Sequence, residues 1–286
     1  SYEWVNEGRG LLMKLRRGVT FQDGAPFDAE AVRANIERQM TLQGSFRRGE
    51  MPDVTGVTVL GSHTARIDLR QPFVPLFSIL VTRGGMMVSP RAMEQGRDFA
   101  RNPVCSGPFR FTERVALDRT VVDRWPGHWN AQNVHVQRVV FRPMPDGTVR
   151  LANLRGGALE MMERVSPTDL DTLRRAPGFA LASAPELGHQ FIRFNIANGA
   201  GAQGPFARDA RLREAFEAAI DRAALNQVVF NGAFIPGNQW VSPDNPFYAR
   251  ALPVPGRDLA RARRLLAEAG QPSPQPPISS SSSSGE

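Results

Sequence analysis

The only cysteine of the chain, Cys105, stands beside Ser106 in the stretch NPVCSGPFRF. A thiol or hydroxyl exposed in a tight turn can act as a nucleophile, but it needs a nearby base and a group that orients the base. The stretch supplies neither, whereas Gly107 and Pro108 favour a bend that opens into an extended segment. The four histidines are scattered along the chain at His63, His128, His135 and His189. We therefore expect a structural turn at Cys105, with thiol chemistry as the weaker alternative.

Motifs for metal or cofactor chemistry are missing from the sequence. It contains no HExxH pair, no histidines four residues apart and no cluster of Cys and His. It also lacks a GxSxG elbow, a GxGxxG loop and a GxxxxGK[ST] phosphate loop. We expect no catalytic residue, no metal and no cofactor.

The net charge of +7 and the isoelectric point near 10.9 raise the question of a nucleic-acid partner. Lys14 is the only lysine, and the arginines are spread along the chain in pairs such as Arg16/Arg17, usually near acidic residues. No basic run is interleaved with aromatic residues, as a single-stranded nucleic-acid site requires. We expect no nucleic-acid partner.

No part of the sequence reaches the roughly 18 to 20 uninterrupted apolar residues that a membrane helix needs. The first ten residues, SYEWVNEGRG, lack the basic and apolar regions of a secretion signal, so we expect that any signal has been removed. A single cysteine cannot form an intrachain disulfide. With 41% hydrophobic and 22% charged residues, the composition is that of a globular protein with two cores.

The elements that must position any site follow from periodicity and helix start signals. In the first part we expect a strand at 10–16, a helix capped by Asp28, and a hairpin of strands 54–60 and 64–70. The helix should bury Val32, Ile36 and Met40, and the second hairpin strand Ala65, Ile67 and Leu69. From residue 108 we expect three strands, a helix capped by Asp146 and a buried strand at 158–163. A helix opened by Ser166 and strands at 179–184 and 190–195 should follow. The last elements expected are two helices over 209–230, the second capped by Asp221, and a helix over 258–270.

Several ordered blocks resemble the family 5 extracellular solute-binding proteins of ABC importers. They are LRRGVTFQDGAPFDAEAVRANIER (15–38), NPVCSGPFRFTERVALDRTVVDRWPGHWN (102–130), the following VVFRPMPDGTVRLANLRGGALEMME, and the later helices FARDARLREAFEAAIDRAAL and RDLARARRLLAEAG. The resemblance covers about residues 2 to 271. The family usually has glycine where Cys105 stands, so a positive φ at this position is in doubt.

The resemblance implies an α/β fold, a two-lobed periplasmic binding protein of type II-like form with an extra α+β domain, incomplete in this chain. Residues 1–98 would be the extra domain, 99–187 part of lobe I and 188–271 the first part of lobe II. The proline- and serine-rich 272–286 would be a linker, tag or placeholder tail.

Five residues are the candidates for contact with a ligand. His189, Gln190 and Phe191 lie in GHQFIRFN, where relatives place tyrosines at the cleft, although Phe191 and Phe194 could equally be core residues. Arg83 stands in a loop where nickel-chelate binders carry arginine, and a solvated loop arginine is its alternative. Trp240 in PGNQWVSPDNP could form an aromatic wall or pack on its own domain.

The resemblance implies that the protein captures a small polar solute, most often a di- or oligopeptide, in the periplasm of a Gram-negative bacterium. It would act as a monomer and deliver the solute to an ABC permease in the inner membrane. Glutathione and nickel chelates are other solutes of the family. One alternative is a module of the same fold that serves chemoreception or chaperoning. A less favoured one is a hydrolase that uses Cys105 or Ser106.

Overall fold

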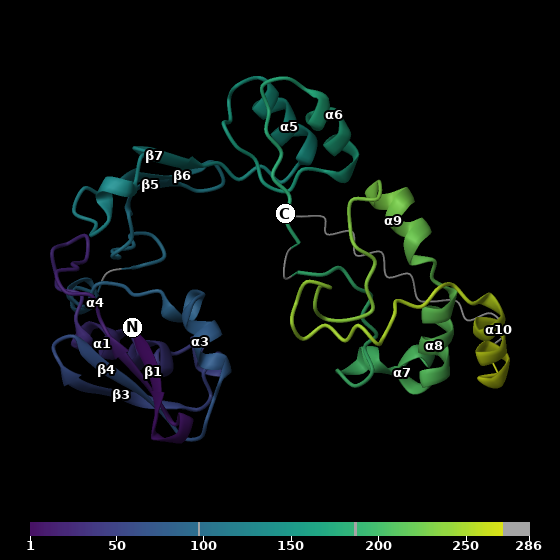
Figure 1. Cartoon of the computed structure of the whole chain (residues 1–286), viewed down its shortest axis with the longest axis horizontal. Coiled ribbons are helices and arrows are strands. Elements are labelled where there is room, and N and C mark those ends of the chain that lie inside the picture. The colour runs from purple at the N-terminus through teal and green to yellow at the C-terminus, as the bar shows by residue number, and fades with distance from the viewer. Residues whose placement is uncertain (97, 186–187, 271–286) are drawn as a thin grey trace. The chain divides into compact units, whose positions relative to one another are not determined.

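The computed structural model describes residues 1–96, 98–185 and 188–270, which form two compact units (Figure 1). Unit 1 comprises Ser1–Pro145 and unit 2 begins at Asp146. The expected tail, 272–286, lies outside the described residues. The three-part division at 98/99 and 187/188 stays a prediction.

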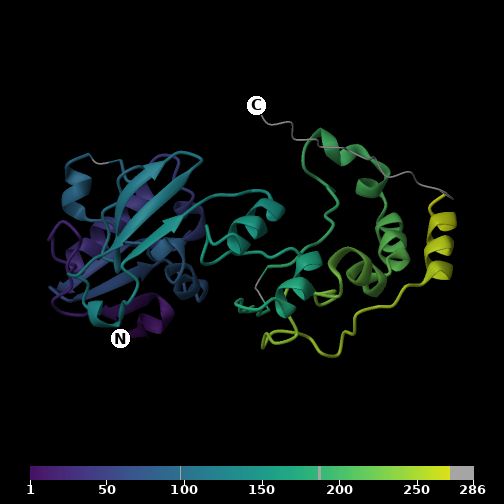
Figure 2. The same ribbon diagram turned by 90° about the horizontal axis from the view of Figure 1, so that it is seen from above.

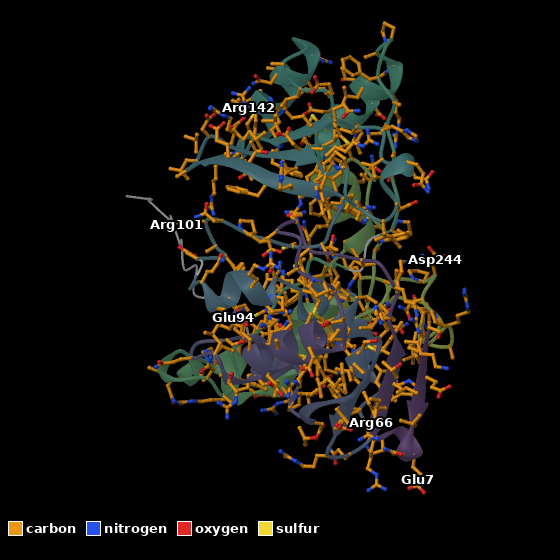
Figure 3. The ribbon with its side chains drawn as sticks, turned by 90° about the vertical axis from the view of Figure 1, so that its left-hand side faces the viewer. Glu7, Arg66, Glu94, Arg101, Arg142 and Asp244 are labelled. Carbon is orange, nitrogen blue, oxygen red and sulfur yellow. The ribbon has the colours of Figure 1, made fainter. Side chains whose placement is uncertain are left out.

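Unit 1 is built on a four-stranded antiparallel sheet in the order β1-β2-β4-β3. Its strands are β1 (Tyr2–Val5), β2 (Gly10–Lys14), β3 (Val54–Gly61) and β4 (Thr64–Leu69). The predicted first strand and the predicted hairpin are confirmed, and Gly61 pairs with Thr64 beside the turn. Charged side chains such as Glu7 and Arg66 lie at the surface of this unit (Figure 3).

Helix α1 (Ala29–Thr41) covers one face of this sheet. It begins where predicted, because the Asp28 carboxylate accepts the Ala31 N–H at 2.9 Å. Val32 and Ile36 are buried against β4, whose alternate residues point into the same core. The buried residues of β4 are Ala65, Ile67 and Leu69, as predicted.

A second antiparallel sheet completes unit 1 (Figure 2). Its order is β5-β6-β7, which confirms the three predicted strands. They are β5 (Phe109–Val115), β6 (Arg119–Arg124) and β7 (Arg138–Phe141). Across the last two, Arg138 donates to both carboxylate oxygens of Asp123, at 2.6 and 3.0 Å. These bonds hold the pKa of Asp123 below its usual range.

Unit 1 also contains short helices and 3-10 turns. They are α2 (Arg47–Glu50), α3 (Pro75–Leu80), α4 (Pro90–Glu94) and the 3-10 turns η1 (Asn6–Gly8), η2 (Arg83–Gly85) and η3 (Ala131–Asn133). The segment before α4 is fixed by Asn35 of α1, whose amide donates to the Val88 carbonyl and accepts the Val88 N–H, at 2.9 and 2.8 Å. Asn35 is buried, so the two ends of its side chain satisfy backbone that water does not reach.

Unit 2 is helical in its described residues, 146–185 and 188–270. Its elements are α5 (Gly147–Arg155), η4 (Pro167–Asp169), α6 (Leu170–Arg175), η5 (Ala200–Gln203), α7 (Pro205–Arg208), α8 (Ala210–Ala219), α9 (Arg222–Phe230) and α10 (Leu259–Glu268). Aspartates cap four of these helices through an amide of the first turn, as predicted for Asp146 and Asp221. The caps are Asp146, Asp209, Asp221 and Asp258.

Helices α8 and α10 pack against each other and form the main contact of unit 2. Arg211 donates to the Glu268 carbonyl at 2.7 Å, and the Asp258 N–H donates to the Ala218 carbonyl at 2.8 Å. The sequence of α8 suggests an apolar stripe of Leu212, Phe216 and Ala219. Leu212 is buried, but the other buried positions are Ala215 and Ala218, and Ala219 is exposed.

Three predicted strands of unit 2, at 158–163, 179–184 and 190–195, are wrong. None of them is a strand, and Met161 of the supposed buried strand is 80% exposed. A β-rich pattern forms a strand only when a neighbouring strand pairs with its backbone, and none of the described residues of unit 2 does so. The predicted helix start at Ser166 is right in position, but the Ser166 hydroxyl contacts Thr168 Oγ1 at 2.8 Å and caps no amide.

Candidate ligand-binding site

The candidate site lies along 188–195, a segment that forms neither helix nor strand. Phe194 packs into unit 2, with its ring centroid 5.1 Å from that of Phe206 and 5.3 Å from that of Phe216. The core alternative therefore holds for Phe194, whereas Phe191 is 50% exposed.

A second group of rings forms an aromatic cluster made of His189, Phe191 and Trp240. The His189 ring lies 4.8 Å from both Phe191 and Trp240, and Phe191 lies 5.5 Å from Trp240. Both contacts of the Trp240 ring are edge-on, the geometry that aromatic quadrupoles favour. Trp240 remains 70% exposed, so its face is available to a ligand.

Arg193 adds a positive charge to this aromatic cluster. Its guanidinium carbon lies 4.9 Å from the Phe191 ring centroid, within the range of a cation–π interaction. The sequence reasoning did not select Arg193. The available signal was the alternation of His189, Phe191 and Arg193 in GHQFIRFN.

The loop that carries Trp240 is held by two amide side chains. Gln239 donates to the Ala249 carbonyl at 3.0 Å and accepts the Ala249 N–H at 2.9 Å. Asn238 donates to the Pro253 carbonyl at 3.0 Å. A loop closed on itself in this way positions the indole without help from a helix or strand.

The structure thus brings together His189, Phe191 and Trp240 of the five predicted residues. Gln190 is exposed and takes no part in the ring contacts. Arg83 is exposed at the start of η2, in unit 1. Their contact with a ligand stays a prediction.

The turn at Cys105 is a structural feature of unit 1, as predicted. Gln22 accepts the Cys105 N–H at 3.4 Å and donates to the Gly107 and Phe109 carbonyls at 3.1 and 2.9 Å. Cys105 does not adopt a positive φ, so this position does not require glycine. Burial raises the pKa of the Cys105 thiol, which disfavours the reactive thiolate. No group of three or more His, Cys, Asp or Glu suited to a metal occurs among the described residues.

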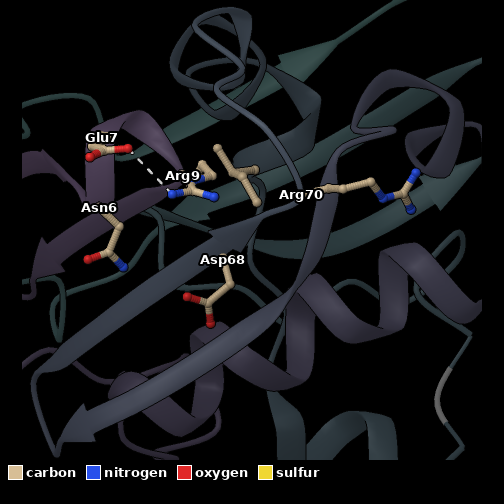
Figure 4. Close-up of a pocket in the computed structure, with 6 residues that line it drawn as sticks. Asn6, Glu7, Arg9, Asp68 and Arg70 are labelled. Carbon is tan, nitrogen blue, oxygen red and sulfur yellow. Dashed lines mark hydrogen bonds and ion pairs between the residues drawn. The ribbon is translucent and has the colours of Figure 1, made fainter.

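A polar depression of about 530 Å³ lies elsewhere in unit 1, where η1 meets the end of β4 (Figure 4). Its charges are largely paired within the protein. Glu7 lies 3.5 Å from Arg9, and Asp68 accepts hydrogen bonds from Arg66 and Thr58, both at 2.5 Å. Since these carboxylates already have partners, the depression offers a ligand less than the aromatic cluster does.

An exposed surface of three rings and a cation offers packing and charge to a solute, and with the α/β fold it is consistent with a solute-binding protein. The comparisons with known proteins agree. The family model "Bacterial extracellular solute-binding proteins, family 5 Middle" matches residues 1–281, and the chain belongs to this family. The resemblance first seen in the sequence blocks is therefore confirmed.

Curated relatives include glutathione-binding proteins of enteric bacteria. The chain is 31% identical to GsiB of Salmonella typhimurium and 30% identical to GsiB of Escherichia coli O1:K1, each over 274 residues. Each match covers 95% of this chain and 52% of the relative. The chain thus spans about half the length of the curated relatives it matches.

Solved structures confirm the fold. NikA from Brucella suis in complex with Fe(III)-EDTA matches with a TM-score of 0.77 at 23% identity, over 94% of this chain and 54% of that one. DppA from Helicobacter pylori in complex with the peptide STSA matches with a TM-score of 0.75 at 22% identity, over 95% and 56%. These are periplasmic binding proteins, which confirms the predicted fold class. None of the helices described for this chain is long and apolar enough to cross a membrane.

Proposed function

We propose that the protein to which this chain belongs is the solute-binding component of an ABC importer and captures a short peptide in the periplasm. It would deliver the peptide to permease subunits in the inner membrane and would act as a monomer. The family match over residues 1–281 is the observation that carries this proposal. The family binds solutes and is not a family of enzymes.

The aromatic cluster supports the choice of this surface as part of the site. Rings that already contact one another lose little freedom when a solute packs on them, and an aromatic contact contributes about 0.5 to 1.5 kcal/mol beyond its buried area. A micromolar dissociation constant corresponds to about 8 kcal/mol, which a modest number of such contacts and hydrogen bonds can supply. Closure of two lobes around the solute would remove water and complete the remaining contacts.

A peptide is proposed as the solute because two kinds of relative point to it. GsiB is named for glutathione, which is itself a tripeptide, and DppA was solved with the peptide STSA. NikA was solved with a metal chelate, so a chelate is the competing class.

Native mass spectrometry of the full-length protein, purified gently from cells, tests the proposal. We expect a bound mass that fragments as a short peptide or as glutathione. Calorimetric titration with di- and tripeptides, glutathione and nickel–histidine should then give micromolar or tighter binding for a peptide. Exclusive binding of the nickel chelate, or binding of none of these compounds, would contradict the peptide proposal.

The aromatic cluster is tested by Trp240→Ala in the same full-length protein. Peptide binding should weaken about tenfold, because the exposed indole face is lost while the loop keeps its amide hydrogen bonds through Asn238 and Gln239. Phe247→Ala is the matched control, since Phe247 is an exposed aromatic residue of the same loop region outside the cluster. Equal effects of the two substitutions would argue against a role for the cluster.

A further inference from the structure

We propose that Arg193 binds a carboxylate of the solute and so makes the protein selective for peptides with a free carboxylate. This assignment rests on the proposed function. It is carried by the position of the guanidinium carbon over the Phe191 ring, which also contacts the rings of His189 and Trp240.

The charge of Arg193 is available to a ligand. No acidic side chain among the described residues forms an ion pair with it, and Arg193 is exposed. Arg211 of the same unit is the contrast, because its guanidinium makes three hydrogen bonds to the Asp209 carboxylate, at 2.6 to 3.2 Å. The Arg211 guanidinium is thus paired with Asp209, the residue that caps α8. The Arg193 guanidinium can still donate to a ligand.

The chemistry of arginine suits a carboxylate in particular. The planar guanidinium carries its N–H groups in a fork that matches the two oxygens of a carboxylate. The Phe191 ring also restricts the long side chain, so less rotamer entropy remains to be lost on binding. A lysine at this position would keep the charge but lose the fork and most of the stacking.

The neighbouring rings define the rest of the preferred solute. Phe191 and Trp240 have their centroids 5.5 Å apart, so an apolar group packed on them would lie within a few bonds of a carboxylate held by Arg193. The carboxyl-terminal residue of a peptide, with its side chain next to its carboxylate, has this arrangement. The specificity predicted is therefore for a free carboxyl end beside an apolar or aromatic side chain.

The test compares matched peptide pairs in the full-length protein. The probes are the tripeptide Ala-Ala-Phe, its carboxyl-terminal amide, glutathione, and glutathione esterified at the glycyl carboxylate, all measured by calorimetry. The variants are Arg193→Gln and Arg193→Lys, with Arg263→Gln as the control for loss of one exposed positive charge from α10. Thermal unfolding of each variant monitors folding.

We expect the wild-type protein to bind at least one of the two free acids more tightly than the matching amide or ester. The expected factor is about 10- to 100-fold, which corresponds to the energy of a hydrogen bond to a charged group. Arg193→Gln should lose this preference while its affinity for the amide stays near that of wild type. Arg193→Lys should keep part of the preference, and Arg263→Gln all of it. Unchanged binding of the amide also shows that the variant protein is folded.

The failures of the two proposals can be told apart. If wild type binds none of the four probes, the peptide proposal and the Arg193 assignment both fail. If wild type binds acid and amide equally, or if Arg193→Gln keeps the preference for the acid, only the Arg193 assignment is overturned.

Discussion

Units 1 and 2 are stabilised in different ways. In unit 1 a helix covers a sheet and the core includes fully buried Ile36, Ile67 and Leu76. The buried polar residues found among the described residues, Asn35, Gln39, Asp53 and Ser89, also all lie in unit 1. In unit 2, helix α9 buries no residue and Val228 on it is 83% exposed. Unit 1 therefore depends on packing between distant segments, whereas unit 2 depends more on local helix signals.

The difference also concerns where a ligand can bind. The polar side chains inside unit 1, such as Ser89 and Asp23, are used to hold its own segments together, with Ser89 donating to Asp23 at 2.5 Å. The aromatic rings of the cluster in unit 2 are exposed instead, and a surface of this kind often marks a binding site. Unit 1 has the more densely packed core, and the proposed ligand-binding cluster lies in unit 2.

The strongest test of this contrast is the substitution Ile36→Ala. Ile36 is 0% exposed, so the cavity should lower the free energy of unfolding of unit 1 by about 2 to 5 kcal/mol. Val228→Ala in α9 should change the free energy of unfolding of unit 2, followed by the far-ultraviolet circular dichroism of its helices, by less than about 0.5 kcal/mol. Urea unfolding followed by tryptophan fluorescence reports mainly on unit 1, which holds three of the four tryptophans: Trp4, Trp125 and Trp129. Equal costs for the two substitutions would break the contrast.

A second test removes a polar contact between distant segments. Asn35→Ala leaves the half-buried N–H and carbonyl of Val88 without their side-chain partner, so unit 1 should lose about 1 to 3 kcal/mol. Asn153→Ala is the matched control in unit 2, since Asn153 donates only to Val149 within its own helix, at 2.9 Å. We expect that control to be nearly neutral for unit 2 in urea unfolding followed by circular dichroism, and a comparable loss in both variants would contradict the packing argument.

A third test sharpens the contrast with two equivalent helix caps. Asp28→Ala and Asp221→Ala each remove an acceptor for a first-turn amide at 2.9 Å, a loss of about 1 kcal/mol. Because α1 is packed against the sheet, Asp28→Ala should lower the global stability of unit 1. Because α9 is not buried, Asp221→Ala should act locally. Hydrogen exchange is the measurement, and faster exchange confined to the amides of α9 is the expected result for Asp221→Ala.

The smallest expected effect is a pH dependence of the stability of unit 1 that arises from His128. Burial lowers the pKa of His128, and its Nδ1 accepts the Asn130 N–H at 3.3 Å, which requires a neutral ring. The unfolded chain therefore takes up a proton more readily, so the stability present above about pH 6.5 declines as the pH falls through this value. His128→Gln should flatten the change in urea midpoint between pH 7.5 and 5.5. An identical pH profile in the variant would show that His128 does not contribute.

Much of the local structure could be predicted because its causes are local. An aspartate followed by amphipathic residues begins a helix whatever surrounds it, and this held for Asp28, Asp146, Asp221 and Asp258. The hairpin of β3 and β4 followed from alternation around a short turn, and the turn at Cys105 from the glycine and proline that follow it. The strands expected at 179–184 and 190–195 failed because the partner of a strand is not encoded in the strand itself.

The candidate site shows the same limit. The residue types and the alternation in GHQFIRFN indicated His189 and Phe191, and the turn-rich loop indicated Trp240. Only the tertiary structure placed Trp240, some fifty positions further along the chain, at 4.8 Å from His189, and set Arg193 over Phe191. By itself the sequence determined the family, the helix starts and the turns, because these depend on neighbouring residues and ordered motifs. Which side chains meet was decided by packing, because contacts between distant positions depend on how the whole chain is arranged.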